Sequence, residues 1–342
     1  MRTIKVALDA MGGDHGINVI VPAAIIALEK YENLQLILVG DEARITLAIA
    51  KIKPELKQRL HVHHASQCVT MDDLPSQAVR HKKDSSMRVA INLVKEQKAD
   101  AVVSAGNTGA LMATAYFVLK TIKGIDRPAI MAHIPSTNPN GFLRMLDLGG
   151  NVESSAEQLL QFAVMGSVVA SAVGHIDQPR VALLNIGEED MKGDTRVKQA
   201  AQLLTEHRDI NYVGFAEGDD IFKDVADVIV CDGFVGNVSL KTTEGAFRLL
   251  QETVRKKITR NLRGKFIGLL AQPMLMSIKK RLNPSRYNGA SLLGLRGIVV
   301  KSHGAANVNG FAAAIERAIW EVEDNVIELI ENQIVLLLEN RK

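Results

Sequence analysis

Short apolar runs alternate along the chain with longer stretches in which apolar residues recur every three or four positions. The short runs are rich in Val, Ile and Leu, which predicts buried strands, and the longer stretches predict amphipathic helices. The predicted strands cover residues 3–10, 34–39, 60–64, 99–104, 128–134, 142–148, 180–185, 210–214, 227–231 and 297–302. The predicted helices cover residues 17–31, 42–52, 87–97, 107–120, 154–174, 195–207, 236–261, 264–282 and 307–339.

Strands that alternate with helices indicate an α/β protein with a mostly parallel sheet. One pair departs from this rule, because strands 128–134 and 142–148 flank the turn-forming sequence Asn138-Pro139-Asn140-Gly141. We interpret them as an antiparallel pair inserted in the sheet. No repeat, low-complexity segment or Pro/Gly-rich linker divides the chain, so we expect one α/β body over residues 1–342 with a helical excursion near 245–287.

Five of the apolar runs end in loops built from Gly, Asn and Asp. These loops are residues 11–16, 104–109, 149–151, 185–190 and 231–237. A strand end, a glycine turn and a helix start leave backbone N–H groups free to bind an anion, phosphate above all. Ligands of open α/β sheets sit beyond the carboxyl ends of the strands. We therefore interpret the loops as an anion site, and tight turns without a ligand are the alternative.

Composition narrows the class of protein. The chain has 342 residues, enough for one large or two ordinary domains, and its 47% hydrophobic and 23% charged residues are ordinary for a globular protein. It begins directly with a predicted strand, shows no secretory signal, and has no apolar run long enough to span a membrane. Two cysteines make no disulfide framework. We expect a cytoplasmic protein.

Positive charge is concentrated in one segment. Residues 248–286 hold eleven lysines and arginines against one acid, Glu252, which gives this segment a charge of +10 and leaves −7 for the rest of the chain. The segment also carries an apolar stripe at helical spacing, formed by Phe266, Ile267, Leu270, Met274, Ile278 and Leu282. Basic residues surround the stripe, namely Lys265, Lys279, Lys280 and Arg281. This pattern is typical of a helix that lies in a membrane interface, and packing in a core or dimer is the alternative.

Several common site chemistries lack support in the sequence. Neither G-x-G-x-x-G nor G-x-x-x-x-G-K-[ST] is present, so a nucleotide cofactor is not indicated. His61 and His63 share a face of a predicted strand without an identifiable third metal ligand, and we expect no metal. No G-x-S-x-G elbow indicates a serine hydrolase. Cys231 closes a strand and is more typical of a buried core cysteine than of a nucleophile.

The loops together resemble one family along the whole chain. The residues that carry the resemblance are Asp9-Ala10-Met11-Gly12-Gly13-Asp14, Ser104-Ala105-Gly106-Asn107-Thr108-Gly109, Leu148-Gly149-Gly150-Asn151, Asn185-Ile186-Gly187-Glu188 and Asp232-Gly233-Phe234-Val235-Gly236-Asn237. They are similar to the bacterial phosphate acyltransferases of phospholipid synthesis, the PlsX family. The resemblance implies a homodimer with a three-layer α/β/α sandwich, related to phosphotransacetylases and isocitrate dehydrogenases.

The resemblance also implies a reaction and its partners. A long-chain acyl group would pass from acyl carrier protein to inorganic phosphate, and a membrane glycerol-3-phosphate acyltransferase would use the acyl phosphate. It implies no cofactor and no nucleic acid. Much of the phosphate is already dianionic near pH 7, since second phosphate pKa values lie near ~6, and a thiol with a pKa of about 8.5 leaves without a strong general acid. Such chemistry needs N–H groups, amides and cations more than a catalytic triad.

Candidate residues follow from this chemistry. Lys192 is the preferred cation for phosphate or the carbonyl oxygen, and Asn237 binds the oxyanion or else caps its helix. Lys241 lies one turn further along the same predicted helix. Asn107 and Thr108 would cradle phosphate at a helix start. Asp9, Asp14 and Asp232 would orient these groups, and His15 and His303 are weaker candidates. The remaining substrate-binding candidates are Gly12, Gly13, Ser104, Gly106, Asn185, Gly187 and Gly236.

The sequence leaves other functions open. The basic segment suits docking of an acidic carrier protein as well as an anionic membrane surface. A coenzyme-A-dependent phosphate acetyl- or butyryltransferase would share the chemistry but would not need this segment. A scaffold without catalytic activity, recruited to membranes, would have no use for the Gly/Asn loops. An isocitrate-dehydrogenase-like oxidoreductase would need a metal-binding carboxylate cluster and a nucleotide site. We expect the acyltransferase to be cytoplasmic and peripherally membrane-associated.

Overall fold

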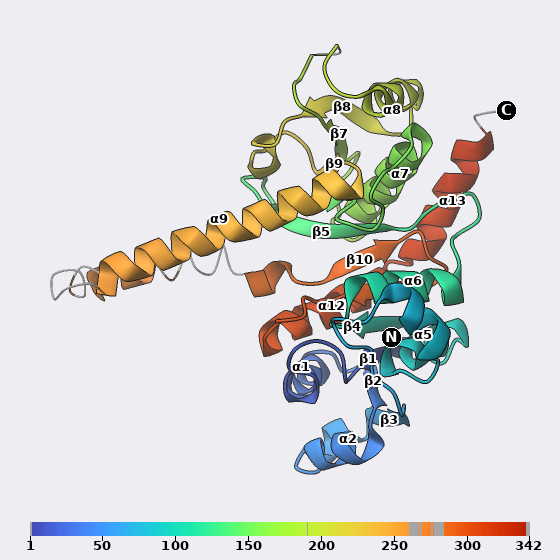
Figure 1. The fold of residues 1–342 in the computed structure, drawn as a ribbon, viewed down its shortest axis with the longest axis vertical. Helices are drawn as coiled ribbons and strands as arrows, with labels where there is room; N and C mark the ends of the chain where they lie inside the picture. Colours follow the sequence, from blue (N-terminus) through green and yellow to red (C-terminus); the bar gives the residue numbers. More distant parts are fainter. Residues whose placement is uncertain are drawn as a thin grey trace.

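The fold is described from a computed structural model that covers residues 2–189, 191–259, 266, 269–274, 276 and 284–339. Eleven strands of these residues form one sheet in the order β3-β2-β1-β4-β11-β10-β5-β6-β9-β7-β8 (Figure 1). The strands are β1 (Ile4–Asp9), β2 (Leu34–Gly40), β3 (Leu60–His64), β4 (Ala101–Ser104), β5 (Ala129–Pro135), β6 (Phe142–Leu146), β7 (Arg180–Leu184), β8 (Asn211–Ala216), β9 (Val228–Val230), β10 (Ala290–Leu293) and β11 (Ile298–Lys301).

The sheet contains two parallel blocks that run in opposite directions. Strands β3, β2, β1, β4 and β11 are parallel to one another, and so are β6, β9, β7 and β8. Between the blocks, β10 is antiparallel to β11 and β5, and β5 is antiparallel to β6. The predicted antiparallel pair is therefore confirmed as β5 and β6. The expected mostly parallel α/β sheet with an antiparallel section is confirmed as well.

Helices cover both faces of the sheet, as the hydrophobic pattern requires. The helices are α1 (Ile17–Lys30), α2 (Glu42–Ala48), α3 (Pro54–Lys57), α4 (Pro75–His81), α5 (Ser86–Lys95), α6 (Thr108–Leu119), α7 (Ala156–Ala172), α8 (Thr195–Glu206), α9 (Gly233–Thr259), α12 (Val308–Glu323) and α13 (Val326–Glu339), with 3-10 turns η1 (Asp220–Phe222) and η2 (Pro284–Tyr287). Strand β1 shows the alternation: Val6 and Leu8 pack with α1 and α12, and Ala7 packs with α5 and α6 on the opposite face. Burial on both faces explains why the strands read as continuous apolar runs.

The observed elements correct the predictions at a few points. The sequence pattern did not predict β10, α3 or α4. The predicted helix 307–339 is two helices, because Asn325 adopts a positive φ of 49° between α12 and α13. The predicted helix 264–282 falls largely outside the described residues. None of the described helices has the length and hydrophobicity needed to cross a membrane.

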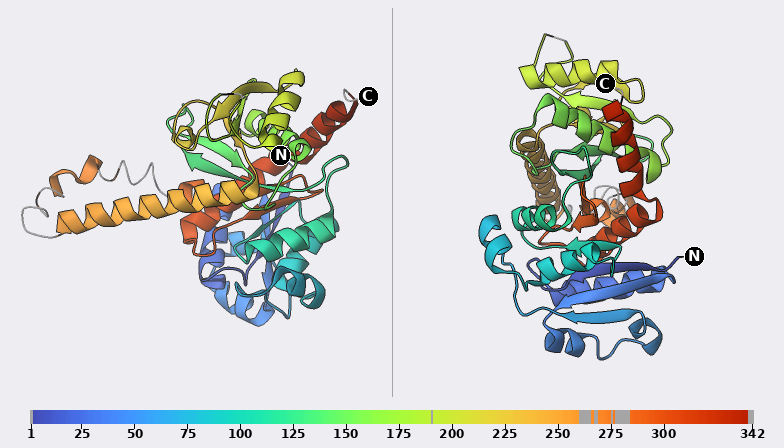
Figure 2. Two further views of the ribbon diagram at one scale, coloured as in Figure 1. Left: turned by 45° about the horizontal axis from the view of Figure 1, so that its top comes forward. Right: turned by 90° about the vertical axis from the view of Figure 1, so that its right-hand side faces the viewer.

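Helix α9 leaves the body of the molecule. Figures 1 and 2 show it projecting as a long rod from its first turns, which lie beside β9 and the loop after β6. Of its 27 residues, only Gly233 and Gly236 are buried. The first turns of α9 therefore belong to the body, and the remainder forms the start of the predicted excursion.

Candidate functional site

A cavity of about 690 Å³ lies between the two blocks of the sheet, beneath the body end of α9. Its apolar lining residues are Ile130, Ala132, Ile134, Leu148, Leu240 and Phe247. Basic side chains line the same space, namely Lys241, Arg248, Lys301 and His303. The cavity therefore offers apolar surface and positive charge side by side, and the acidic side chain of Glu244 also lines it.

Four of the sequence-predicted residues line this cavity. They are Thr108 at the start of α6, Asn237 and Lys241 in α9, and His303 after β11. A Cβ atom built on Gly149 would lie 3.4 Å from the Asn237 side chain, so the loop after β6 and α9 meet at this point. The N–H groups in the first turn of an α-helix have no partner within the helix, and the α6 start at Thr108 and Gly109 presents such a turn to the cavity.

Asp147 holds the loop after β6 against α9. Its side chain is fully buried and its two oxygens accept four hydrogen bonds, from the N–H groups of Ile130, Gly150 and Asn151 and from Asn151 Nδ2, at 2.7–2.9 Å. Burial raises the pKa of Asp147. A Cβ atom at Gly236 would overlap the carbonyl oxygen of Asp147. Close backbone packing, rather than anion binding, thus explains glycine at this position.

Asp9 joins the loops after β1 and β4. It is 1% exposed and accepts hydrogen bonds from Ser86 Oγ at 2.5 Å and Ser104 Oγ at 2.6 Å, while Ser104 Oγ accepts one from the N–H of Gly106 at 3.1 Å. Burial raises the pKa of Asp9. Gly12 packs against this group, since its Cβ would lie 2.6 Å from Asp9 Oδ2. Asp9 therefore ties β1, β4 and α5 together, while the orienting role predicted for it stays a prediction.

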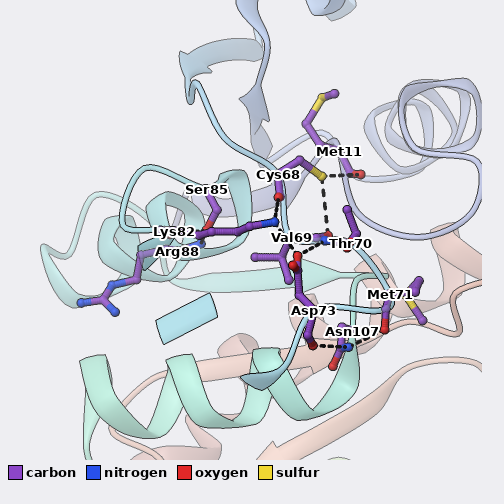
Figure 3. Close-up of polar contacts among 10 residues, drawn as sticks. All are labelled: Met11, Cys68, Val69, Thr70, Met71, Asp73, Lys82, Ser85, Arg88 and Asn107. Carbon is purple, nitrogen blue, oxygen red and sulfur yellow. Dashed lines mark hydrogen bonds and ion pairs between the residues drawn. The ribbon is translucent and has the colours of Figure 1, made fainter. Parts of the chain in front are cut away.

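The amide of Asn107 fastens a neighbouring loop, as Figure 3 shows. Its Oδ1 accepts from the N–H of Ala110 at 3.0 Å, and its Nδ2 donates to the carbonyl oxygens of Met71 at 2.7 Å and Asp73 at 3.2 Å. Lys82 secures the same loop from the other side, through Asp73 Oδ2 at 2.5 Å. Asn107 therefore caps α6 and anchors the loop 71–73, while the phosphate-binding role predicted for it stays a prediction.

The loop after β1 packs against the segment that follows β11. Gly13 has a φ of +78°, and the N–H of Asp14 donates to the carbonyl oxygen of Gly304 at 3.0 Å. Asp14 and His15 are exposed. These contacts place the loop next to His303, whose Nδ1 accepts a hydrogen bond from the N–H of Ala305 at 3.1 Å.

Lys192 lies in a loop whose polar groups bond to one another. Its Nζ is 2.6 Å from Glu189 Oε2, its side chain is 44% exposed, and it is not among the residues that line the cavity. Asn185 Nδ2 donates to the carbonyl oxygens of Gly187 at 3.0 Å and Lys192 at 3.2 Å. The position of β7 in the sheet explains this difference: β7 is separated from β6 by β9, so Lys192 follows a strand further from β5, β10 and β11, whose residues line the cavity.

The structure also locates Asp232 and part of the predicted apolar stripe. Asp232 Oδ1 accepts from the N–H of Val235 at 2.8 Å and so caps α9. Of the predicted apolar stripe, Phe266, Leu270 and Met274 are 62%, 68% and 63% exposed. Six of the predicted contact residues lie outside the described residues: Lys265, Ile267, Ile278, Lys279, Lys280 and Arg281.

Sequence reasoning missed two buried groups of the cavity wall. Lys301, the last residue of β11, is 8% exposed, and burial lowers its pKa to about 8. His133 is 6% exposed, its Nδ1 lies 2.5 Å from Arg317 Nη2, and its Nε2 has no partner among the described residues. The signal for Lys301 was its place at a strand end, directly before Ser302-His303-Gly304. His133 gave no such signal, since it sits inside an apolar strand.

Metal and thiol chemistry find little support in the described part of the chain. No group of three or more His, Cys, Asp or Glu side chains is arranged there to hold a metal ion. Cys231 is buried, and burial raises the pKa of its thiol well above the ordinary value. Such a thiol is a poor source of thiolate at neutral pH.

Solved structures share this fold. A phosphotransacetylase from Streptococcus pyogenes matches with a TM-score of 0.62, and EutD phosphotransacetylase from Staphylococcus aureus matches with 0.59. Each is 17% identical in sequence, and each match covers 94% of both chains. The protein therefore has the phosphotransacetylase fold.

Sequence comparison gives the family. A family model described as fatty acid synthesis protein matches residues 4–329. The phosphate acyltransferase of Alkalilimnicola ehrlichii is 55% identical over 337 residues, 98% of both chains, and that of Legionella pneumophila is 53% identical over 334 residues, 98% of this chain and 97% of the relative. The chain belongs to the phosphate acyltransferase family, which is a family of enzymes. The resemblance seen in the loops is confirmed.

Proposed function

We propose that the enzyme transfers a long-chain fatty acyl group from acyl carrier protein to inorganic phosphate, giving an acyl phosphate for phospholipid synthesis. Membership of the phosphate acyltransferase family supports the acyl transfer to phosphate. The observation that carries the proposal is the cavity, whose lining combines apolar side chains such as Leu240 and Phe247 with the buried cation Lys301. An acyl thioester and a phosphate need such a pair of surfaces.

The reaction joins the two substrates directly. A phosphate oxygen attacks the thioester carbonyl carbon, the carbonyl oxygen takes up negative charge, and the carbon–sulfur bond then breaks to release the thiolate. Phosphate binds at the α6 start, near Thr108 and Lys241, where free N–H groups and positive charge favour a dianion. Asn237 donates a hydrogen bond to the developing oxyanion from across the cavity. Holding the two anionic partners together supplies the remaining catalysis.

The α9 segment serves delivery in this proposal. The apolar residues Phe266, Leu270 and Met274 are exposed, and the segment from 248 to 286 carries a charge of +10. Such a surface binds an anionic membrane and steers the acidic carrier protein. Product could then pass to a membrane glycerol-3-phosphate acyltransferase. We further propose a cytoplasmic, peripherally membrane-associated homodimer with residues 1–342 as one catalytic domain.

The decisive assay measures phosphate-dependent release of thiol. Palmitoyl carrier protein, palmitoyl-coenzyme A and acetyl-coenzyme A are compared as acyl donors, each with and without inorganic phosphate. The proposal expects fastest release from palmitoyl carrier protein and none without phosphate. Preference for acetyl-coenzyme A would favour the coenzyme-A-dependent acetyltransferase instead, and no phosphate-dependent release from any donor would favour the scaffold.

The residue assignments are tested by substitution. Asn237→Ala removes the proposed oxyanion donor and is expected to lower kcat about 10²- to 10³-fold. Lys192→Ala tests the cation that the sequence favoured, with the exposed Lys57→Ala as its control. If either the folded Asn237→Ala or the folded Lys192→Ala enzyme retains full acyl phosphate synthesis, the role proposed for that residue is wrong.

A further inference from the structure

Lys301 is a buried cation in the cavity wall. It ends β11, where it pairs with Ser104 of β4 and Ala290 of β10, and it is 8% exposed. A lysine ammonium has three N–H donors. Two of them go to backbone carbonyl oxygens, those of Ala105 at 3.4 Å and of Ser302. One donor remains for a ligand in the cavity.

The charge of Lys301 lacks a direct counter-ion. Among the described residues, no carboxylate oxygen lies within 4.0 Å of its Nζ. Asp9 is close enough to favour the charged form of Lys301, but its oxygens are bonded to Ser86 and Ser104. A buried charge without a partner is costly. An anion bound in the cavity would supply the missing partner.

Other groups around the cavity favour the same kind of ligand. The α6 start lines it, and so does Lys241 of α9, whose Nζ is 2.8 Å from Glu244 Oε2. His303 lines it as well; because its Nδ1 accepts the N–H of Ala305, the neutral ring carries its proton on Nε2 and can donate from there. Asp14 and Glu244 are the acidic groups that face this set, from the loop after β1 and from α9. A small dianion held by several donors fits this arrangement.

We propose that Lys301 is the phosphate-binding cation of this cavity, with its free N–H donated to an oxygen of inorganic phosphate. The assignment deepens the proposed function, on which it rests for the identity of the anion. Main-chain carbonyls hold the ammonium in place, so Lys301 is positioned before the ligand arrives. Lys192 and Lys241, by contrast, are 44% and 56% exposed and are already paired with Glu189 and Glu244.

The assignment has a consequence for pH dependence. Burial lowers the pKa of Lys301 to about 8, and a bound dianion favours the charged amine. Phosphate affinity therefore falls as pH rises through about 8, approaching tenfold per pH unit above it. Lys301→Arg keeps the positive charge at every pH of this range, since an arginine side chain stays protonated. Comparison with this variant separates the titration of Lys301 from the titrations of Asp9, Asp14, Lys241, Glu244 and His303.

The experiment measures binding of inorganic phosphate to the full chain by calorimetry at constant ionic strength, from pH 7.0 to 9.5. Lys301→Met is expected to weaken phosphate binding about ten- to a hundredfold at pH 7.0, since a charge-assisted hydrogen bond is lost. Lys301→Arg is expected to bind phosphate without the fall near pH 8. The exposed Lys5→Met, on the same sheet but away from the cavity lining, should match the unaltered enzyme.

Several outcomes would overturn the assignment. A folded Lys301→Met protein with unaltered phosphate affinity would do so, and so would an Arg variant that keeps the fall near pH 8. If Lys301→Met fails to fold by circular dichroism, the comparison with Lys301→Arg decides. Acyl transfer is assayed separately: loss of phosphate binding in Lys301→Met supports the assignment even if the unaltered enzyme transfers no acyl group. Acyl transfer with an unchanged KM for phosphate in Lys301→Met overturns the assignment and leaves the proposed function intact.

Discussion

Asp147→Asn retains the size of a fully buried side chain and removes its negative charge. The carboxylate accepts two hydrogen bonds on each oxygen, from Ile130 and Gly150 on Oδ1 and from the N–H and Nδ2 of Asn151 on Oδ2. An asparagine can orient its single oxygen toward only one of these pairs. Its NH2 group then faces two N–H donors that have lost their acceptor.

The expected cost follows from those two donors. A buried donor left unpaired costs about 1–3 kcal/mol, so two give at most about 2–6 kcal/mol, and Asn151 Nδ2 retains its bond to the carbonyl oxygen of Pro128 at 2.8 Å. The lower half of this range is expected, because burial raises the pKa of Asp147 and the neutral amide relieves that desolvation. With an unfolding entropy of about 2.1 cal/mol/K per residue, a loss of about 2–4 kcal/mol lowers Tm by about 3–6 °C for a chain of this length.

The assay is thermal and urea unfolding followed by circular dichroism. Asp177→Asn serves as the control, since Asp177 is exposed, and it is expected to change stability by less than about 0.5 kcal/mol. Acyl transfer should also fall in Asp147→Asn, because the loop that meets Asn237 is loosened. A stability loss below about 1 kcal/mol in Asp147→Asn would refute the role assigned to this hydrogen-bond cluster.

Three further predictions test other parts of the structure. Gly236→Ala places a methyl group on the carbonyl oxygen of Asp147 and is expected to prevent stable packing of α9. Gly245→Ala, with open space around its Cβ, should instead stabilise the folded protein by about 0.5–1 kcal/mol. Thermal unfolding of the two variants checks this, and equal effects on stability would contradict it. Burial raises the pKa of Glu321 to about 7. The folded state therefore binds more protons than the unfolded state between about pH 4.5 and 7. As pH rises through this window, the free energy of unfolding of the enzyme should fall by up to about 3 kcal/mol relative to that of Glu321→Gln. Urea unfolding measures this difference, and a difference that does not change with pH would rule the prediction out. Leu270→Glu should weaken binding to anionic vesicles in flotation, with binding to neutral vesicles as the control, and unchanged flotation would exclude a membrane role for this residue.

Much of the fold was predictable because the periodicities are strong. Strands such as β1 and β2 are buried on both faces, and each gave an apolar run that matched the observed bounds within a residue or two. The β5–β6 pair was predictable from the turn chemistry of residues 138–141. Strand β10 was not predicted, because it has only four residues, between Gly289 and Gly294, and its position depends on antiparallel partners on both sides.

The site was less predictable, because one residue type serves several purposes. Asn107 and Asn185 resemble phosphate ligands in sequence, yet their amides bond to the carbonyl oxygens of nearby loops. Lys192 and Lys301 both follow an apolar strand, and only the structure separates them. The places of their strands in the sheet decide the difference: β11 lies next to β10 at the centre, and β7 lies beyond β6 and β9.

The sequence by itself determined the α/β class, the family and the Gly/Asn loops at the strand ends. These depend on local periodicity and on contiguous motifs, which a linear chain displays directly. The tertiary structure decided which loops meet. The loops after β4, β6 and β9 border one cavity, although β4 belongs to one parallel block of the sheet and β6 and β9 to the other. Lys301 lines this cavity because β11 lies beside the antiparallel strands at the centre of the sheet, whereas β7 lies toward its far edge and Lys192 is not among the lining residues.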